Sequence, residues 1–250
     1  MHNKSLEKRE HMSTWEDTLK ELDDALQSMR GTEPLFRGHA NDSWSLLPGL
    51  GRRPLKEVEN PLYYDFTSKG HHLLGRPENT WHSLFLMQHH GVPTRLLDWS
   101  SSFAVALYFA LKGAMTDCAV WVLDPYQLNQ ETIGVFGLCY LPIDFPPGYE
   151  KYFVDSHNPH GHFGTFPAPA VALGADATTP RILAQQGYFT LHRDLDVPLN
   201  EVCSSALKKV GVPQSAHKDA RHFLRLAGMN EYSLFPDMDG LARHLVAEMK

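Results

Sequence analysis

The residues whose types and spacing best suit chemistry lie in one stretch, from Gln88 to Ala110. Within it, Arg95 and Asp98 bracket two leucines just ahead of an apolar segment. Arginine carries five N–H donors in a fixed fork that suits phosphate or carboxylate. A carboxylate ahead of a helix can cap that helix, hold a substrate hydroxyl or act as a base. We expect this stretch to carry part of a site, with helix capping as the commoner alternative for Asp98. If the chain is extended here, Arg95 and Asp98 point to opposite faces and need not be partners.

A second candidate arginine, Arg37, stands between Phe36 and Gly38. Burial of Phe36 would fix the end of a strand, and Gly38 would let a ligand approach the backbone. This pattern makes Arg37 a candidate anion-binding residue. The alternative is a structural salt bridge at a strand end.

A third group precedes Gly187. Arg181 and Gln185 are four residues apart, which places them on one helix face. Gln185 and Gln186 offer uncharged donors and acceptors of the kind that nucleoside or ribose recognition needs. Ordinary capping of a helix end is the alternative for this pair.

Histidine is plentiful, at 15 residues, yet the sequence predicts no metal site. His157, His160 and His162 form a short run, but no His-Glu-x-x-His helix and no thiolate partner accompanies them. Surface loops are the expected place for these histidines. His89 and His90 stand at the start of the stretch above, where one of them can titrate near neutral pH.

Composition and absent motifs exclude several classes of function. A net charge of -6 argues against a dedicated duplex-binding surface, while a few arginines in a cleft still suit a small anion. Three widely spaced cysteines indicate a reducing compartment, and no apolar run is long enough to span a bilayer, so we expect a cytoplasmic protein without a membrane segment. The chain contains no Gly-x-Gly-x-x-Gly motif, no phosphate-loop lysine motif and no Gly-x-Ser-x-Gly elbow.

The elements that must position these residues follow from periodicity and turn signals. A capping box at Ser13 and Glu16 predicts a helix that keeps one apolar face to Met29. Ser100 is expected to cap a buried helix over 101–112, and residues 129–169 are expected to be an irregular insertion. Strands are predicted near 35–38, 119–123, 170–173, 188–191 and 207–210. The fold class is therefore α+β, a single domain with a small mixed or antiparallel sheet and helical elements at both ends.

At these residues the chain resembles the FRG domain family, named for the motif present here as Phe36-Arg37-Gly38. Residues 1–30 would then be a tail and an amphipathic helix, and residues 31–250 the FRG domain. The resemblance implies a soluble, mostly bacterial domain. The segments that carry it are 36–38, 44–48, Arg53, 88–100, 106–110, Arg181, Gln185, Gly187, Phe189 and 234–237.

A weaker likeness to the ADP-ribosyltransferase fold implies NAD as the cofactor. In that fold an Arg or His on the first strand contacts NAD, a polar motif leads into an apolar helix, and a late Glu or Gln assists the chemistry. Arg37, the segment from Asp98 to Ala110, and Gln185 or Gln186 occur here in that order. No Glu stands at the third position, which is a departure from the pattern.

The resulting hypothesis is a cleft for a nucleotide-like anion, with NAD cleavage or ADP-ribosyl transfer to an unknown protein or nucleic-acid acceptor. Its catalytic residues would be Arg37, Asp98 and Gln185. Arg37 and Arg95 would hold the pyrophosphate, and Trp99 or Tyr108 would stack on nicotinamide. A non-catalytic module that binds a nucleotide or a nucleic-acid end is the alternative. The remaining candidate binding residues are Arg53, His90, Thr94, Arg181 and Gln186.

Overall fold

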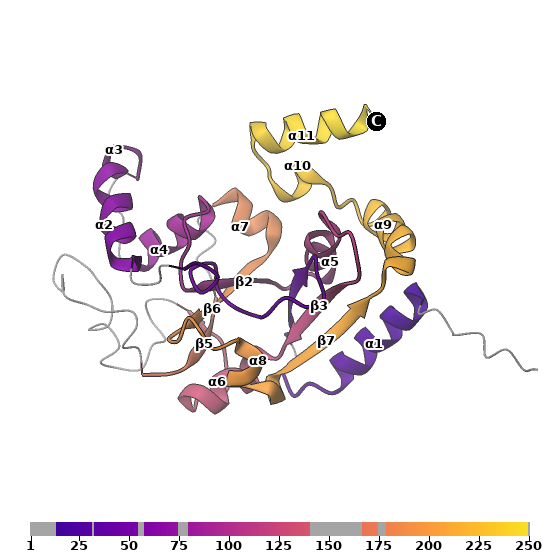
Figure 1. Cartoon of the computed structure of the whole chain (residues 1–250), viewed down its shortest axis with the longest axis horizontal. Helices are drawn as coiled ribbons and strands as arrows, with labels where there is room; N and C mark the ends of the chain where they lie inside the picture. The colour runs from indigo at the N-terminus through magenta and orange to yellow at the C-terminus, as the bar shows by residue number, and fades with distance from the viewer. Residues whose placement is uncertain are drawn as a thin grey trace, which may run out of the picture.

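The computed structural model describes residues 14–31, 33–54, 58–74, 80–140, 167–174 and 179–249. Its strands form one seven-stranded sheet in the order β4-β5-β6-β2-β1-β3-β7, with helices on both faces (Figure 1). The predicted α+β class is confirmed. The strands are β1 (Leu35–His39), β2 (Leu96–Ser100), β3 (Cys118–Leu123), β4 (Cys139–Tyr140), β5 (Ala170–Gly174), β6 (Gly187–His192) and β7 (Leu207–Val212).

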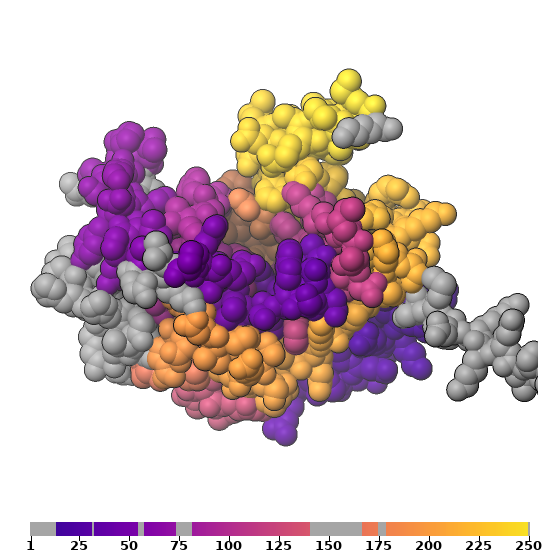
Figure 2. All heavy atoms as spheres, in the orientation of Figure 1, coloured from indigo at the N-terminus to yellow at the C-terminus, as the bar shows by residue number. Residues whose placement is uncertain are grey.

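The helices follow the apolar segments of the sequence, and several begin at a residue whose side chain caps the first turn, as Thr14, Ser102 and Asp124 do. They are α1 (Trp15–Gln27), α2 (Glu59–Lys69), α3 (His71–Leu74), α4 (Thr80–His89), α5 (Phe103–Leu111), α6 (Pro125–Ile133), α7 (Pro180–Gln185), α8 (Leu199–Val202), α9 (His217–Leu226), α10 (Glu231–Leu234) and α11 (Met238–Glu248). Helix α11 projects from the body of the molecule (Figure 2, yellow), whereas Leu234 of α10 packs against Val105 of α5.

The sheet consists of two halves that are weakly joined. β1 pairs with β3 over five residues, and β2 pairs with β6 over five residues. Between β1 and β2, by contrast, Phe36 and Ser100 are the one pair in register. Beyond that pair the two central strands separate, which leaves room between residues 37–39 and the start of β2.

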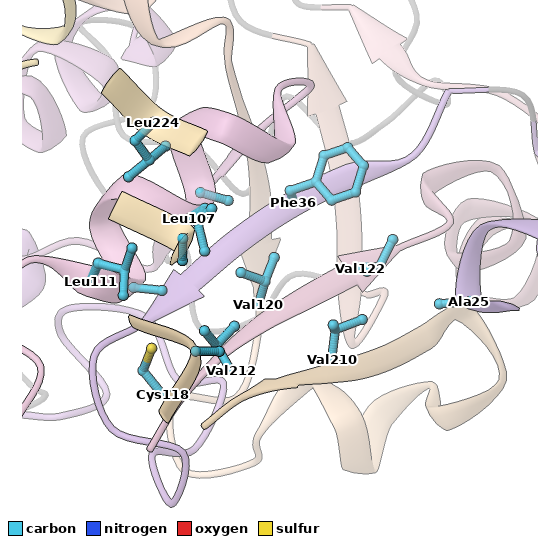
Figure 3. Packing of buried hydrophobic residues seen from close by; sticks show 14 residues of the cluster. Ala25, Phe36, Leu107, Leu111, Cys118, Val120, Val122, Val210, Val212 and Leu224 are labelled. Carbon is cyan, nitrogen blue, oxygen red and sulfur yellow. The ribbon is translucent and has the colours of Figure 1, made fainter. Parts of the chain in front are cut away.

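Each half has its own helical cover on the same face of the sheet. Over β1, β3 and β7, the side chains of Phe36, Val120 and Val210 pack against α5, α9 and α1 (Figure 3). Over β5, β6 and β2, an apolar cluster that includes Leu96 and Phe189 packs against α4 and α2. The boundary between these two covers therefore runs along the separation of β1 and β2.

The opposite face of the sheet is covered by α6 and α8. Leu97 and Trp99 of β2 pack there with Leu128 and Leu199. Because side chains alternate along a strand, Asp98 and Ser100 point to the face that bears α5 and α4.

Several expectations about the elements need correction. Ser100 belongs to β2, and Ser102 caps α5 instead, with its side chain accepting from the N–H of Val105. Helix α1 is capped by Thr14, and Asp17 completes its capping box; Ser13 lies outside the described residues. The segment 129–169 is partly regular, since α6 continues to Ile133 and β4 follows. Residues 141–166 lie outside the described part.

The other predictions hold. The helix at 103–111 is buried as expected, with Ala106, Leu107 and Ala110 at most 2% exposed. Strands β1, β3, β5, β6 and β7 occur where the alternation and turn signals place them.

Candidate functional site

A cavity of about 350 Å³ lies where the two helical covers meet over the separated strands. We call it the central pocket. Its walls come from β1, β2, the end of α4, one side of α5, and α7. The lining residues are Phe36, Arg37, Gly38, Ala40, Trp44, Gln88, Asp98, Trp99, Ser100, Val105, Ala106, Phe109, Lys112, Arg181 and Gln185.

Arg37 occupies the separation between the central strands. Its side chain is 15% exposed. Its Nη1 donates to the carbonyl oxygen of Asp98 at 2.8 Å, and its Nε donates to Nε2 of His39 at 3.3 Å. Burial lowers the pKa of Arg37 to about 10, although the nearby charge of Asp98 opposes this shift. Arg37 thus bridges the two halves where backbone pairing has stopped.

Asp98 presents its carboxylate to the pocket, with a side chain that is 54% exposed. Oδ2 lies 3.7 Å from Nη1 of Arg37 and accepts from Nε2 of Gln88 at 2.7 Å. Oε1 of Gln88 in turn accepts from the Thr94 hydroxyl at 2.6 Å, and that hydroxyl accepts from the N–H of Leu96 at 3.1 Å. This chain of hydrogen bonds fixes the Gln88 amide so that its NH₂ group faces the carboxylate.

The corner between α7 and β6 is bonded directly to the corner between β2 and α5. The Ser100 hydroxyl donates to the carbonyl of Gln185 at 2.7 Å, and the N–H of Ser101 donates to the carbonyl of Gln186 at 3.1 Å. Gln186 adopts φ 46, a left-handed conformation that is uncommon for a residue other than glycine. These bonds hold the stretch from Gln88 to Ala110 against Gln185 and Gln186.

Arg181 and Gln185 form the wall of the pocket next to the C-terminal segment. Nη1 of Arg181 donates to the carbonyl of His89 at 3.0 Å, and its guanidinium carbon lies 4.8 Å from the ring centre of Phe235. Nε2 of Gln185 donates to the carbonyl of Leu234 at 3.1 Å. The prediction that Arg181 and Gln185 share a helix face is confirmed, since both line the pocket.

Lys112, at the end of α5, is tied to the same C-terminal segment. Its Nζ lies 2.7 Å from Oε1 of Glu231 and 4.9 Å from the ring centre of Phe235. Burial alone would raise the pKa of Glu231, but hydrogen bonds from Lys112, Tyr108 and Arg243 lower it to about 2. Glu231 therefore connects α10 to α5 through its ionised carboxylate.

Two predicted ligand-binding residues are almost fully buried. Arg95 is 3% exposed and forms a buried ion pair with Glu59, and its Nη1 donates to the carbonyls of His192 and Arg193. As predicted, the side chains of Arg95 and Asp98 point in different directions and are not partners. Trp99 is also 3% exposed, and its indole N–H donates to the Thr190 hydroxyl at 3.1 Å on the opposite face of the sheet. Arg95 is thus enclosed by protein groups outside the pocket, whereas Trp99 lines the pocket as a residue that is almost fully buried.

The remaining predicted residues surround the pocket without lining it. Arg53 lines an adjoining cleft, and His90 lines a hollow beside Arg181. The Tyr108 hydroxyl donates to Glu231 at 2.6 Å. The Thr94 hydroxyl donates to the side chain of Gln88, which itself lines the pocket. The Gln186 side chain accepts a hydrogen bond from the Ser101 hydroxyl at 3.1 Å.

Gln88, Trp44, Lys112 and Arg52 were not among the predicted site residues, but the structure places them at the pocket or in the adjoining cleft. A signal existed for two of them. Lys112 is the charged residue directly after an otherwise apolar helix, and Gln88 is a polar residue at the end of one. Trp44 and Arg52 stand in irregular segments, whose placement no periodicity predicts.

Among the described residues, no group of three or more His, Cys, Asp or Glu side chains is arranged to hold a metal ion. His157, His160 and His162 lie outside that part of the chain. No helix in the described part has the length and apolar character needed to cross a membrane.

Residues 32–118 match the family model described as the FRG domain. This segment runs from just before β1 to the start of β3, so it contains Arg37, Gln88, Asp98 and all of α5. Comparison with curated proteins and with solved structures gives no match.

Proposed function

We propose that this chain, which contains an FRG domain, binds a nucleotide-like anion in the central pocket and that the ligand is NAD. The observation that carries the proposal is the convergence of three distant motifs. Arg37 of β1, Asp98 of β2 and Gln185 of α7 line one cavity. They occur in the order in which the ADP-ribosyltransferase likeness expects its cofactor-contacting groups.

The charges of the pocket suit cleavage of the bond between nicotinamide and ribose. When that bond breaks, nicotinamide leaves with the electron pair and positive charge develops on the sugar. Negative or dipolar groups that are already oriented stabilise such a charge. The Asp98 carboxylate, held by Gln88, supplies the negative group. Water or another acceptor then attacks the anomeric carbon and loses a proton, which Asp98 is placed to accept.

The apolar walls of the pocket suit a planar ring. Phe36, Trp44 and Phe109 line it, and Trp44 is half exposed at its rim. Aromatic rings favour offset stacking on other planar rings. The stacking role expected of Trp99 or Tyr108 therefore passes in this proposal to Trp44 and Phe109.

The decisive measurement is turnover of NAD by the full chain, followed as free nicotinamide by NMR. We expect release by the wild-type protein and a loss of about a hundredfold or more in Asp98→Asn, because the amide removes the negative charge from beside the sugar. Asp42→Asn is the matched control, since Asp42 is a surface carboxylate paired with Lys209 outside the pocket. Failure to bind NAD at millimolar concentration would refute the proposal, as would an Asp98→Asn protein that is as active as the control.

A binding module without catalysis is the second candidate. Gln185, rather than a carboxylate, occupies the late position, and its amide nitrogen is already bonded to Leu234. Retained NAD affinity with no release of nicotinamide would favour this alternative over the enzyme.

A further inference from the structure

A second cleft adjoins the central pocket and shares two of its walls. It has a volume of about 360 Å³ and contains Gln88 and Asp98, which also line the central pocket. We call it the arginine cleft. Its lining residues are Gly49, Arg52, Arg53, Gln88, Gly91, Val92, Pro93 and Asp98.

The positively charged side chains of the two cavities differ in whether they are already bonded to other protein groups. In the central pocket, Arg37 is bonded to the Asp98 carbonyl, Arg181 to the His89 carbonyl, and Lys112 to Glu231. In the arginine cleft, Arg52 and Arg53 are exposed and form no ion pair with any described residue. Arg52 lines the same cleft as Asp98 of β2, and its charge contributes to lowering the pKa of both Arg37 and His39. The free positive charge therefore stands outside the central pocket, next to Asp98.

The loop that carries the two arginines is fixed by its backbone. Leu50 is fully buried, and its N–H donates to the carbonyl of Thr94 at 3.0 Å. The N–H of Arg53 donates to the carbonyl of Leu50 at 3.0 Å. At Gly51 a Cβ atom would stand 2.3 Å from the carbonyl oxygen of Leu195, so the chain packs closely there. These contacts hold the loop against the start of β2 and leave the guanidinium groups facing solvent.

We propose that the arginine cleft is the phosphate subsite of the ligand, with Arg52 and Arg53 as its binding residues. This inference rests on the proposed function, because it assigns the ring end of the same ligand to the central pocket. A volume of about 350 Å³ is at the small end of the range of about 300–1,000 Å³ for ligand pockets, so a dinucleotide must extend beyond it. Guanidinium groups bind phosphate oxygens in bidentate fashion.

Asp98 determines the direction in which the ligand lies. Its carboxylate stands at the junction of the two cavities and repels phosphate, while it attracts sugar hydroxyls. The ring and its ribose therefore enter the central pocket first, the ribose lies beside Asp98, and the phosphates follow into the arginine cleft. The acceptable ligand class is a nucleotide that carries its phosphates on the far side of the ribose from the ring.

The test compares a ligand with phosphates and one without. Binding of NAD and of nicotinamide riboside, which has the same ring and sugar but no phosphate, is measured by calorimetry on the full chain and on Arg52→Gln and Arg53→Gln. We expect each substitution to weaken NAD about tenfold, which corresponds to ~1.4 kcal/mol, and to leave the riboside unchanged. Arg225→Gln on the exposed side of α9 is the matched control, and it should bind both ligands as the wild type does.

Two results would overturn the subsite. NAD affinity that is unchanged in both variants removes the role of the arginines, and equal losses for NAD and riboside show that they only support the loop. If the wild type binds neither NAD nor nicotinamide riboside, the proposed function fails and inorganic pyrophosphate decides the subsite separately. Pyrophosphate bound by the wild type and lost in Arg52→Gln supports the cleft as an anion site; no pyrophosphate binding overturns it.

Discussion

At the scale of single residues, two arginines that look alike in the sequence have opposite surroundings. Arg37 stands in the separation of the central strands, beside an exposed carboxylate. Arg95 is enclosed by Glu59 and two backbone carbonyls. The alternation of a strand predicted that Arg95 and Asp98 diverge. It could not predict the partner, since Glu59 lies 36 positions away and carries no sequence signal that it is buried.

Arg95 should therefore matter for stability rather than for ligand binding. We expect Arg95→Met to lower the free energy of unfolding by about 3–5 kcal/mol, because it leaves the Glu59 carboxylate buried and uncompensated. Urea denaturation measures this loss. The double variant with Glu59→Leu should recover much of it, since neither charge is then buried. If Arg95→Met had the stability of the wild type but bound ligand more weakly, Arg95 would be a ligand-binding residue instead.

At the scale of elements, Gly38 joins β1 to α5. A Cβ atom on Gly38 would stand 2.0 Å from the carbonyl oxygen of Ala106 and 2.5 Å from the N–H nitrogen of Ala110. The sequence correctly suggested that a group comes close to the backbone here, but the expected group was a ligand. The group is the helix itself, and its identity could not be inferred because α5 lies more than sixty residues further along the chain.

Replacing Gly38 should consequently disturb both the fold and the pocket. In Gly38→Ala, either β1 or α5 must shift, since the clash is with backbone atoms; we expect a loss of about 1–3 kcal/mol of stability. Ala106 and Phe36 line the central pocket, so its affinity for ligand should fall as well. Gly137→Ala is a suitable control, because a Cβ there meets nothing within 4 Å. Equal melting temperatures for the two variants would show that the contact of β1 with α5 is not tight.

Contacts between distant parts of the chain also limit what the sequence reveals of the site as a whole. Local signals were sufficient for Arg37, Asp98, Arg181 and Gln185, because each stands in a motif of unusual residues. They were insufficient for the assembly, which depends on β1 and β2 separating after a single pair. The two strands and the helices that cover them come from distant parts of the chain, so no local signal indicates where the pairing stops.

At the scale of the whole molecule, each half of the sheet contains a buried histidine beside an arginine. His39 of β1 and His192 of β6 are at most 2% exposed. Burial first, and then the nearby arginine charges, lower the pKa of each from its ordinary 6.5 to about 3. Nδ1 of each ring has no hydrogen-bond partner among the described residues. Both rings are therefore neutral in the folded protein across the physiological range.

This arrangement makes the stability of the protein fall as the solution is acidified below pH 6.5. Between pH 6.5 and about 3 the unfolded chain binds a proton at each histidine and the folded chain does not, so the free energy of unfolding rises with pH. The full slope is about 1.4 kcal/mol per pH unit for each histidine. Urea denaturation between pH 7.5 and 5 isolates this effect from Glu231, whose carboxyl has an ordinary pKa of 4.5 and is lowered to about 2. We expect His39→Gln to reduce the slope, because the unfolded variant no longer binds the proton that His39 takes up. A slope that is flat down to pH 5, or that is the same in His39→Gln, would show that His39 has the same pKa in the folded protein as in the unfolded chain.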